Sequence, residues 1–111
     1  MVAFFTGAAA AAASAGHAEE ALLDADLTGA NLENANLAMG VLEFADFTDA
    51  NLTGANLMRA EAAGARFTGT NLTRAVFRKA DIQDARFSGA SGVESIVDLD
   101  KAKNRNMALF D

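Results

Sequence analysis

Side chains able to perform chemistry are sparse in this chain of 111 residues and belong to a few types. The chain has no Cys, which removes disulfides, thiolate metal sites and cysteine nucleophiles. A single His, His17, removes most metal and acid–base sites that rely on imidazole. The 15 acidic residues against nine basic ones give a net charge of -6, which argues against general nucleic-acid binding because that needs a basic face. Carboxylates and amides remain, so their spacing decides what they could do.

These polar residues recur every five positions. Stepping by five from Leu22 to Phe87 meets a large apolar residue at 13 of 14 positions, with Ala62 as the exception. The residue two before each of these centres is Ala at 11 of the 14, and the residue directly before is usually Asn, Asp or another polar type. A period of five matches neither an α-helix nor a flat strand. The pattern predicts a chain that turns a corner every five residues, with Gly at some corners and one large and one small residue inward per side.

A second period, of 20 residues, indicates how many sides make one turn. At this spacing two rows of like residues superpose: Asn31, Asn51 and Asn71, followed by Ser91, and Thr28, Thr48, Thr68 and Ser88. A 15-residue spacing would instead place Asn31 beside Asp46 and Glu61. Because like residues stack well in a solenoid, four sides per coil are favoured.

The repeating unit resembles that of the pentapeptide-repeat family. The runs that carry the resemblance are Ala25-Asp26-Leu27-Thr28-Gly29, Ala30-Asn31-Leu32, Ala50-Asn51-Leu52-Thr53-Gly54 and Ala55-Asn56-Leu57. The resemblance spans residues 20–91. It implies an all-β fold, a right-handed quadrilateral parallel β-helix of about three and a half coils, since 14 sides are shared among coils of four. The hand of the coil follows from the resemblance alone.

The acids and amides of such a coil lie in outward columns on a convex surface. No catalytic triad converges there, and no Gly-rich loop precedes a helix. An interior filled by Leu, Phe and Ala leaves no room for a substrate. We therefore expect no enzyme activity, no cofactor and no metal. Hydrogen bonds between coils explain the Asn rows most simply, and an ion pair is expected between Asp46 and Arg66, which are one coil apart.

Residues 1–19 precede the repeat and form an apolar, Ala-rich segment. No charge occurs before Glu19, and Ala13-Ser14-Ala15 resembles a small-residue cleavage site. Three interpretations stay open: a leader for export or lumen targeting, an ordered helix that caps the first coil, or a membrane contact through residues 1–18.

Residues 92–111 follow the repeat and leave its register, since Gly92 stands where a Leu is due. The end of a solenoid exposes its apolar interior and needs a cover. Apolar residues for this purpose occur in Ser95-Ile96-Val97-Asp98-Leu99 and Met107-Ala108-Leu109-Phe110. We expect a short helical or irregular cap folded over the last coil.

One outward corner is unusually apolar for a surface. Seven residues define it, and we call them the corner patch: Met39, Val41, Phe44, Met58, Arg59, Arg78 and Lys79. The four apolar members cluster at the corner, and the three basic ones lie on the following coils. An apolar patch with a basic rim suits a protein contact. The alternative is that Phe44 folds back against the wall of the coil.

Two functions fit such a surface. The favoured one is a non-catalytic scaffold or interaction module in the thylakoid lumen, or a periplasm, that binds or braces a photosynthetic membrane complex. It rests on the apolar segment 1–19 and on the resemblance to small lumenal members of the family. The alternative is a cytoplasmic DNA mimic that inhibits or protects a type II topoisomerase (gyrase), as some members do. Residues 1–58 hold eight acids and no base, which supports the mimic, while the nine basic residues of 59–111 oppose it.

Overall fold

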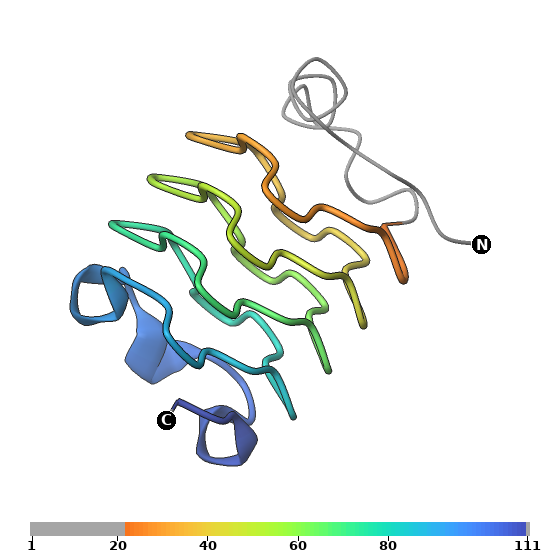
Figure 1. Cartoon of the computed structure of the whole chain (residues 1–111). Helices are drawn as coiled ribbons and strands as arrows, with labels where there is room; N and C mark the ends of the chain where they lie inside the picture. The colour runs from red at the N-terminus through yellow and green to blue at the C-terminus, as the bar shows by residue number, and fades with distance from the viewer. Residues whose placement is uncertain (1–21, 111) are drawn as a thin grey trace.

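The computed structural model describes residues 22–110 as a stack of coils in which each side carries one parallel bridge residue (Figure 1). The bridges join residues 20 apart, such as Asp26 with Asp46 and Asn31 with Asn51. Bridge residues at 26, 31, 36 and 41 precede the return at 46, so each turn has four sides as predicted. Within the described range no side forms a regular strand, and the named elements are three short 3-10 helices. Residues 1–19, His17 among them, lie outside the described residues. The three interpretations of this segment therefore concern a part of the chain that the structure does not describe.

Each corner is a tight turn whose third residue has a left-handed backbone. The N–H three residues after a centre donates to the carbonyl of that centre, as Ala25 does to Leu22 at 2.9 Å. The residue two after the centre has a positive φ whether or not it is glycine, for example 68° at Gly29 and 59° at Asn34. This conformation costs a non-glycine residue about 1–2 kcal/mol. The corner glycines of the sequence therefore occupy the position where they relieve strain.

The interior is filled by the centre residues and by the residues two before them, as the five-residue period predicts. The centres stack in four columns, and each defines one face: face A holds Leu22, Leu42, Ala62 and Ile82, face B holds Leu27, Phe47, Phe67 and Phe87, face C holds Leu32, Leu52 and Leu72, and face D holds Leu37, Leu57 and Phe77. All of these side chains are buried. The Ala row inside face C has one polar member, Thr70, whose hydroxyl donates to the carbonyl of Phe47 at 2.6 Å. Burial of a large apolar side chain contributes about 1.5–3 kcal/mol, so this column packing is the main stabilising interaction.

Ala62 stands in face A where a large residue is due, and two rings occupy the interior of its coil. Phe67 and Phe77 come from the same coil, and their centroids lie 5.7 Å apart with the rings at 67°. Ala62 itself is fully buried. The coil with the small Ala62 side chain is thus also the coil that has two phenyl rings in its interior.

We predict that Ala62→Leu lowers the free energy of unfolding by about 1–3 kcal/mol because the added atoms overpack this coil. Urea denaturation followed by far-ultraviolet circular dichroism measures the change. Unchanged or increased stability would instead show that a void lies beside Ala62.

Residues 92–110 continue the coil with longer sides, and this last turn contains the short helices expected of a C-terminal cap. The bridges run on as Val76 with Val97, Asp81 with Lys103 and Arg86 with Leu109, so the spacing grows to 21, 22 and 23 residues. One six-residue step therefore replaces each five-residue step. The ladder keeps its hydrogen bonds, since Val97 N–H donates to the carbonyl of Ala75 at 2.8 Å.

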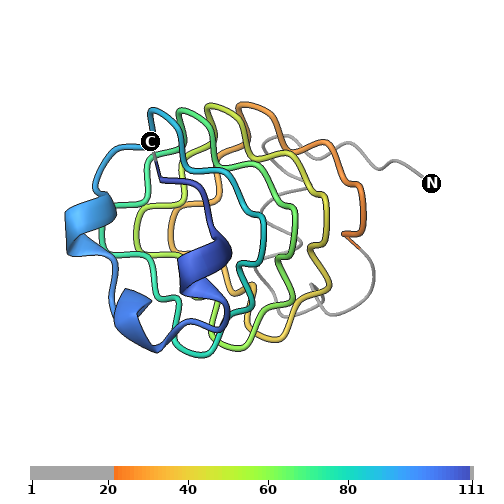
Figure 2. The same ribbon diagram turned by 90° about the horizontal axis from the view of Figure 1, so that it is seen from below.

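The extra residue of each long side is taken up by a 3-10 helix at the corner. These helices are η2 (Val93–Ser95), η3 (Leu99–Lys101) and η4 (Arg105–Met107), and Figure 2 shows them spaced around the perimeter of the C-terminal coil. Each follows a residue in left-handed backbone: Gly92, Asp98 or Asn104. The wider coil covers the apolar end of the stack.

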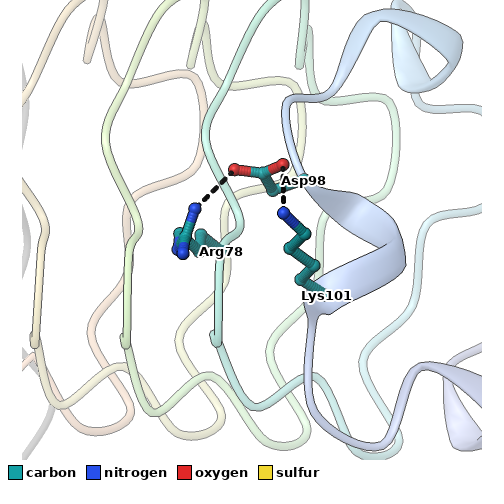
Figure 3. Close-up of polar contacts among 3 residues, drawn as sticks. All are labelled: Arg78, Asp98 and Lys101. Atoms are coloured by element: carbon teal, nitrogen blue, oxygen red, sulfur yellow. Dashed lines mark ion pairs between the residues drawn. The ribbon is translucent and has the colours of Figure 1, made fainter.

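Side-chain contacts add to the backbone ladder in attaching this last coil to the coil before it. Inside, the Phe110 ring stacks on Phe87 with centroids 4.7 Å apart, which extends the aromatic column of face B. Outside, the Asp98 carboxylate lies 3.7 Å from Arg78 and 3.8 Å from Lys101 (Figure 3). Exposed ion pairs contribute about 0–1 kcal/mol. The aromatic stack therefore stabilises the last coil, and the ion pairs help to orient its second corner, at η3.

Candidate functional site

The outward Asn and Asp side chains cap the turns of their own coil. The Oδ1 atom of Asn51 accepts the N–H of Thr53 at 3.0 Å and its hydroxyl at 2.7 Å. Asn71 does the same with Thr73. Between residues 22 and 110 no hydrogen bond joins the Asn side chains of neighbouring coils, so the predicted ladder bonds are wrong. A partner two residues away satisfies each oxygen first, because the turn holds that N–H within reach.

The acids of face B are held in the same way. Asp26 accepts the N–H of Thr28 at 3.0 Å, and this backbone hydrogen bond lowers the pKa of the Asp26 carboxyl from its ordinary value. Asp46 accepts both the N–H and the hydroxyl of Thr48. The ion pair expected between Asp46 and Arg66 is wrong, because the ion pairs found among residues 22–110 involve Asp98 alone. Arg66 is instead exposed.

The structure places five members of the corner patch together, at the corner between faces D and A. Met39, Arg59 and Lys79 stack there on successive coils, and Met58 and Arg78 directly precede the last two of them. The backbone confirms the stacking, since the N–H of Met39 donates to the carbonyl of Met58 at 2.9 Å and the N–H of Arg59 to that of Arg78 at 2.8 Å. Val41 comes two residues after this corner, where it bridges to Glu61 on face A.

Phe44 lies one corner further on, between faces A and B. A Cβ atom added to Gly64 would come within 2.6 Å of Phe44 ring carbons, so the ring lies against the Gly64 backbone of the next coil. The Phe44 residue is nevertheless 64% exposed. Phe44 therefore folds onto the wall and still presents a large apolar surface, but it does so beside face B.

Large side chains at these corners carry backbone strain. The φ angles are 59° at Met39 and Arg59 and 60° at Phe44. Other corners use Gly at the equivalent position, where the same φ is unstrained. Strained left-handed residues persist where the side chain serves a purpose that glycine cannot. Corners outside the corner patch, such as those of Asn34 and Arg74, have the same left-handed φ, so this strain is shared along the coil.

A surface groove runs beside Phe44, and the five-residue and 20-residue periods do not predict it. The groove has a volume of about 460 Å³, and its lining residues are Asp24, Phe44, Asp46, Gly64, Arg66, Asp84 and Arg86. They come from the A–B corner and from the outward positions of face B. Among the described residues no three acidic or His side chains gather into a metal site. The same part of the chain contains no helix long and apolar enough to cross a membrane.

Comparison with known proteins identifies the repeat. The family model for pentapeptide repeats matches eight copies over residues 25–61 and 55–91, which is the range of the regular coil. The chain belongs to the pentapeptide-repeat family. Proteins of this family are generally structural rather than catalytic, and a comparison with curated proteins gives no match.

Three solved pentapeptide-repeat proteins are similar in structure. The first, from the Arabidopsis thaliana thylakoid lumen, is 28% identical with a TM-score of 0.50 and covers 59% of this chain and 48% of its own. Rfr23 from the cyanobacterium Cyanothece 51142 is 23% identical with a TM-score of 0.48, covering 81% and 60%. HetL from Nostoc sp. strain PCC 7120, involved in the regulation of heterocyst differentiation, is 32% identical with a TM-score of 0.33, covering 81% and 36%. The present chain thus spans about half of the lumenal protein.

Proposed function

We propose that this pentapeptide-repeat chain is a non-catalytic interaction module that acts in the thylakoid lumen and binds a photosynthetic membrane complex. The D–A corner carries the proposal. Met39 is 57% exposed there, in a left-handed conformation that glycine would adopt without strain. The similarity to a pentapeptide-repeat protein of the Arabidopsis thaliana thylakoid lumen supports the compartment.

The chemistry of the D–A corner favours an apolar contact with an acidic edge on the partner. Met39 and Met58 form the apolar centre, and flexible Met side chains adapt to a partner surface. Arg59 and Lys79 are exposed beside them. Arg78 already lies within an ion-pair distance of Asp98, so it contributes less free charge to the edge. In a binding surface of this kind, the apolar centre contributes most of the affinity and the charges contribute most of the specificity.

The DNA-mimic alternative receives no support from the outward charges. Along face B, Asp26 and Asp46 are followed by Arg66 and Arg86 on the next two coils. A duplex mimic needs a continuous row of negative charge. The basic half of the column interrupts that row.

We predict that Met39→Asp combined with Met58→Asp weakens binding to the membrane complex about a hundredfold or more. The reason is the loss of two apolar contacts of about 1.5 kcal/mol or more each. The corner should accept an aspartate in place of Met39, since Asp24, Asp49 and Asp84 occupy equivalent left-handed positions. Purified protein is added to opened thylakoid membranes, and co-migration with the solubilised complexes is measured on native gels.

The matched control is Asn34→Asp with Gln83→Glu, which adds the same charge at other outward positions without changing side-chain size. It should co-migrate like the unmodified chain. The proposal fails if the unmodified chain joins no membrane complex. It also fails if the Met39 and Met58 double variant binds as well as the control.

A further inference from the structure

The outward charges of face B read acid, acid, base, base along the chain. In the reverse direction every sign is the opposite, so a second copy in the reverse direction would be complementary. The charged members of the column are Asp26, Asp46, Arg66 and Arg86, consecutive members are joined by parallel bridges, and the exposed Leu109 follows Arg86. The charges are therefore evenly spaced, at about 4.8 Å per coil. Two negative charges are followed by two positive ones.

We propose that face B is the contact surface of an antiparallel homodimer. A two-fold axis between the levels of Asp46 and Arg66 places each acid opposite a base of the second copy. Asp46 then meets Arg66 of the other copy, and Asp26 meets Arg86. Such an interface uses the same surface patch on both subunits. All four charges of each column find an opposite partner in register, because both columns have the same spacing.

The charges of the column are available for this contact. Arg66 and Arg86 are exposed, and neither takes part in an ion pair within residues 22–110. The turns use the Oδ1 atoms of Asp26 and Asp46, in bonds of 3.0 and 2.9 Å from Thr28 and Thr48. The turn bonds fix the direction of each carboxylate, and they leave the second oxygen for a guanidinium group. Ion pairs across a contact direct specificity and association more than they add affinity.

The remainder of face B is flat, which allows two copies to approach closely. Its second outward row contains only small hydroxyl residues: Thr28, Thr48, Thr68 and Ser88. The corner beyond this row carries Gly29, Gly69 and Gly89, and Asp49 is the single member with a side chain. The small hydroxyl residues leave this row of face B without large side chains. The antiparallel arrangement pairs hydroxyl rows with each other.

Phe44 supplies the apolar part of the contact. Its ring lies over Gly64, so it spans the two levels between which the proposed axis passes. The two-fold axis therefore brings the Phe44 rings of both copies together, where each covers the groove that Arg66 and Arg86 line. The Phe44 residue is 64% exposed in the single chain, and pairing removes part of that surface from water. One face of a solenoid this small is a limited contact, so we expect weak, concentration-dependent association.

Sedimentation equilibrium of the full chain over a range of concentrations tests the proposal. At low salt the mass should rise toward that of a dimer, and about 0.5 M salt should weaken the association about tenfold or more because it screens the pairs. The variant Arg66→Glu with Arg86→Glu turns the column fully acidic and should stay monomeric. The control Arg74→Glu with Lys103→Glu makes the same charge change on other faces and should dimerise like the unmodified chain.

A mixing experiment separates ion pairing from misfolding. Asp26→Asn with Asp46→Asn removes the acidic charges but keeps the oxygen that caps each turn, so this variant should fold and self-associate weakly. Mixed with the Arg66 and Arg86 double variant, it regains ion pairs in one half of the contact and should form a heterodimer. The proposal is overturned if the unmodified chain stays monomeric at millimolar concentration in low salt. It is also overturned if the control loses dimerisation as much, or if mixing restores nothing.

Discussion

Phe67→Ala should lower the free energy of unfolding by about 3–5 kcal/mol, the largest effect expected from one substitution in the regular coil. The Phe67 ring is stacked between Phe47 and Phe87, with centroid distances of 5.0 and 4.9 Å. It also meets Phe77 from the opposite face at 5.7 Å. Its removal leaves a cavity that the neighbouring coils cannot close, because the bridges fix their spacing. The substitution therefore removes both the favourable free energy of burying the ring and its three aromatic contacts.

Denaturation by urea, followed by far-ultraviolet circular dichroism, measures this loss in a chain without Trp or Tyr. Phe44→Ala is the matched control, since its ring lies outside the coil and is 64% exposed. The control should change stability by less than about 1 kcal/mol. A similar loss of unfolding free energy in both variants would contradict the conclusion that the face B column stabilises the interior.

Gly92→Ala should detach the last coil and lower stability by about 2–4 kcal/mol, which combines left-handed strain with a steric clash. Gly92 has a φ of 72°. A Cβ atom there would lie 2.7 Å from both the Cα and the N of Thr73. Backbone atoms cannot move aside as a flexible side chain can. The substitution therefore acts where residues 92–110 depart from the five-residue sides.

Gly29→Ala is the control for this variant, because Gly29 has a similar φ of 68° but no atom within 4 Å of an added Cβ. Its free energy of unfolding should fall only by the cost of a left-handed alanine, about 1–2 kcal/mol. Hydrogen exchange reports the site of the damage. In Gly92→Ala the N–H groups of Val97, Lys103 and Leu109, which bond the preceding coil at 2.7–2.9 Å, should exchange faster while that of Asn51 stays protected. Equal protection in both variants would contradict a tail that continues the coil.

The regular coil could be predicted from the sequence because its two periods encode different properties. The five-residue step sets which residue types face inward, and the 20-residue step sets which residues superpose. The sequence shows that the register changes after residue 91, and the six-residue steps that follow are seen in the structure. A six-residue period was present, with Gly92, Asp98 and Asn104 at the left-handed positions and Ile96, Ala102 and Ala108 on the inner side. Three units were too few to separate a wider coil from an irregular cap.

The polar contacts were harder to predict than the packing. The Asn rows superpose as expected, yet each Asn oxygen bonds within its own turn because the local N–H is the nearer donor. The sequence predicts one corner patch from outward positions on the fourth side of a coil and the side that follows it. Phe44 nevertheless lies apart from Met39, since five residues advance the chain by one whole face. Outward position therefore predicts exposure, while the face on which a residue lies decides its neighbours.

Cross-linking from a single position tests the proposed interaction module most directly. The chain contains no Cys, so Met39→Cys provides a unique attachment point for a photoreactive cross-linker at the D–A corner. Glu33→Cys provides the same on face C, where the side chain is also exposed. In opened thylakoid membranes we predict a cross-link from position 39 to a subunit of a membrane complex and none from position 33. Equal cross-linking from both positions, or none from position 39, would contradict binding through this corner.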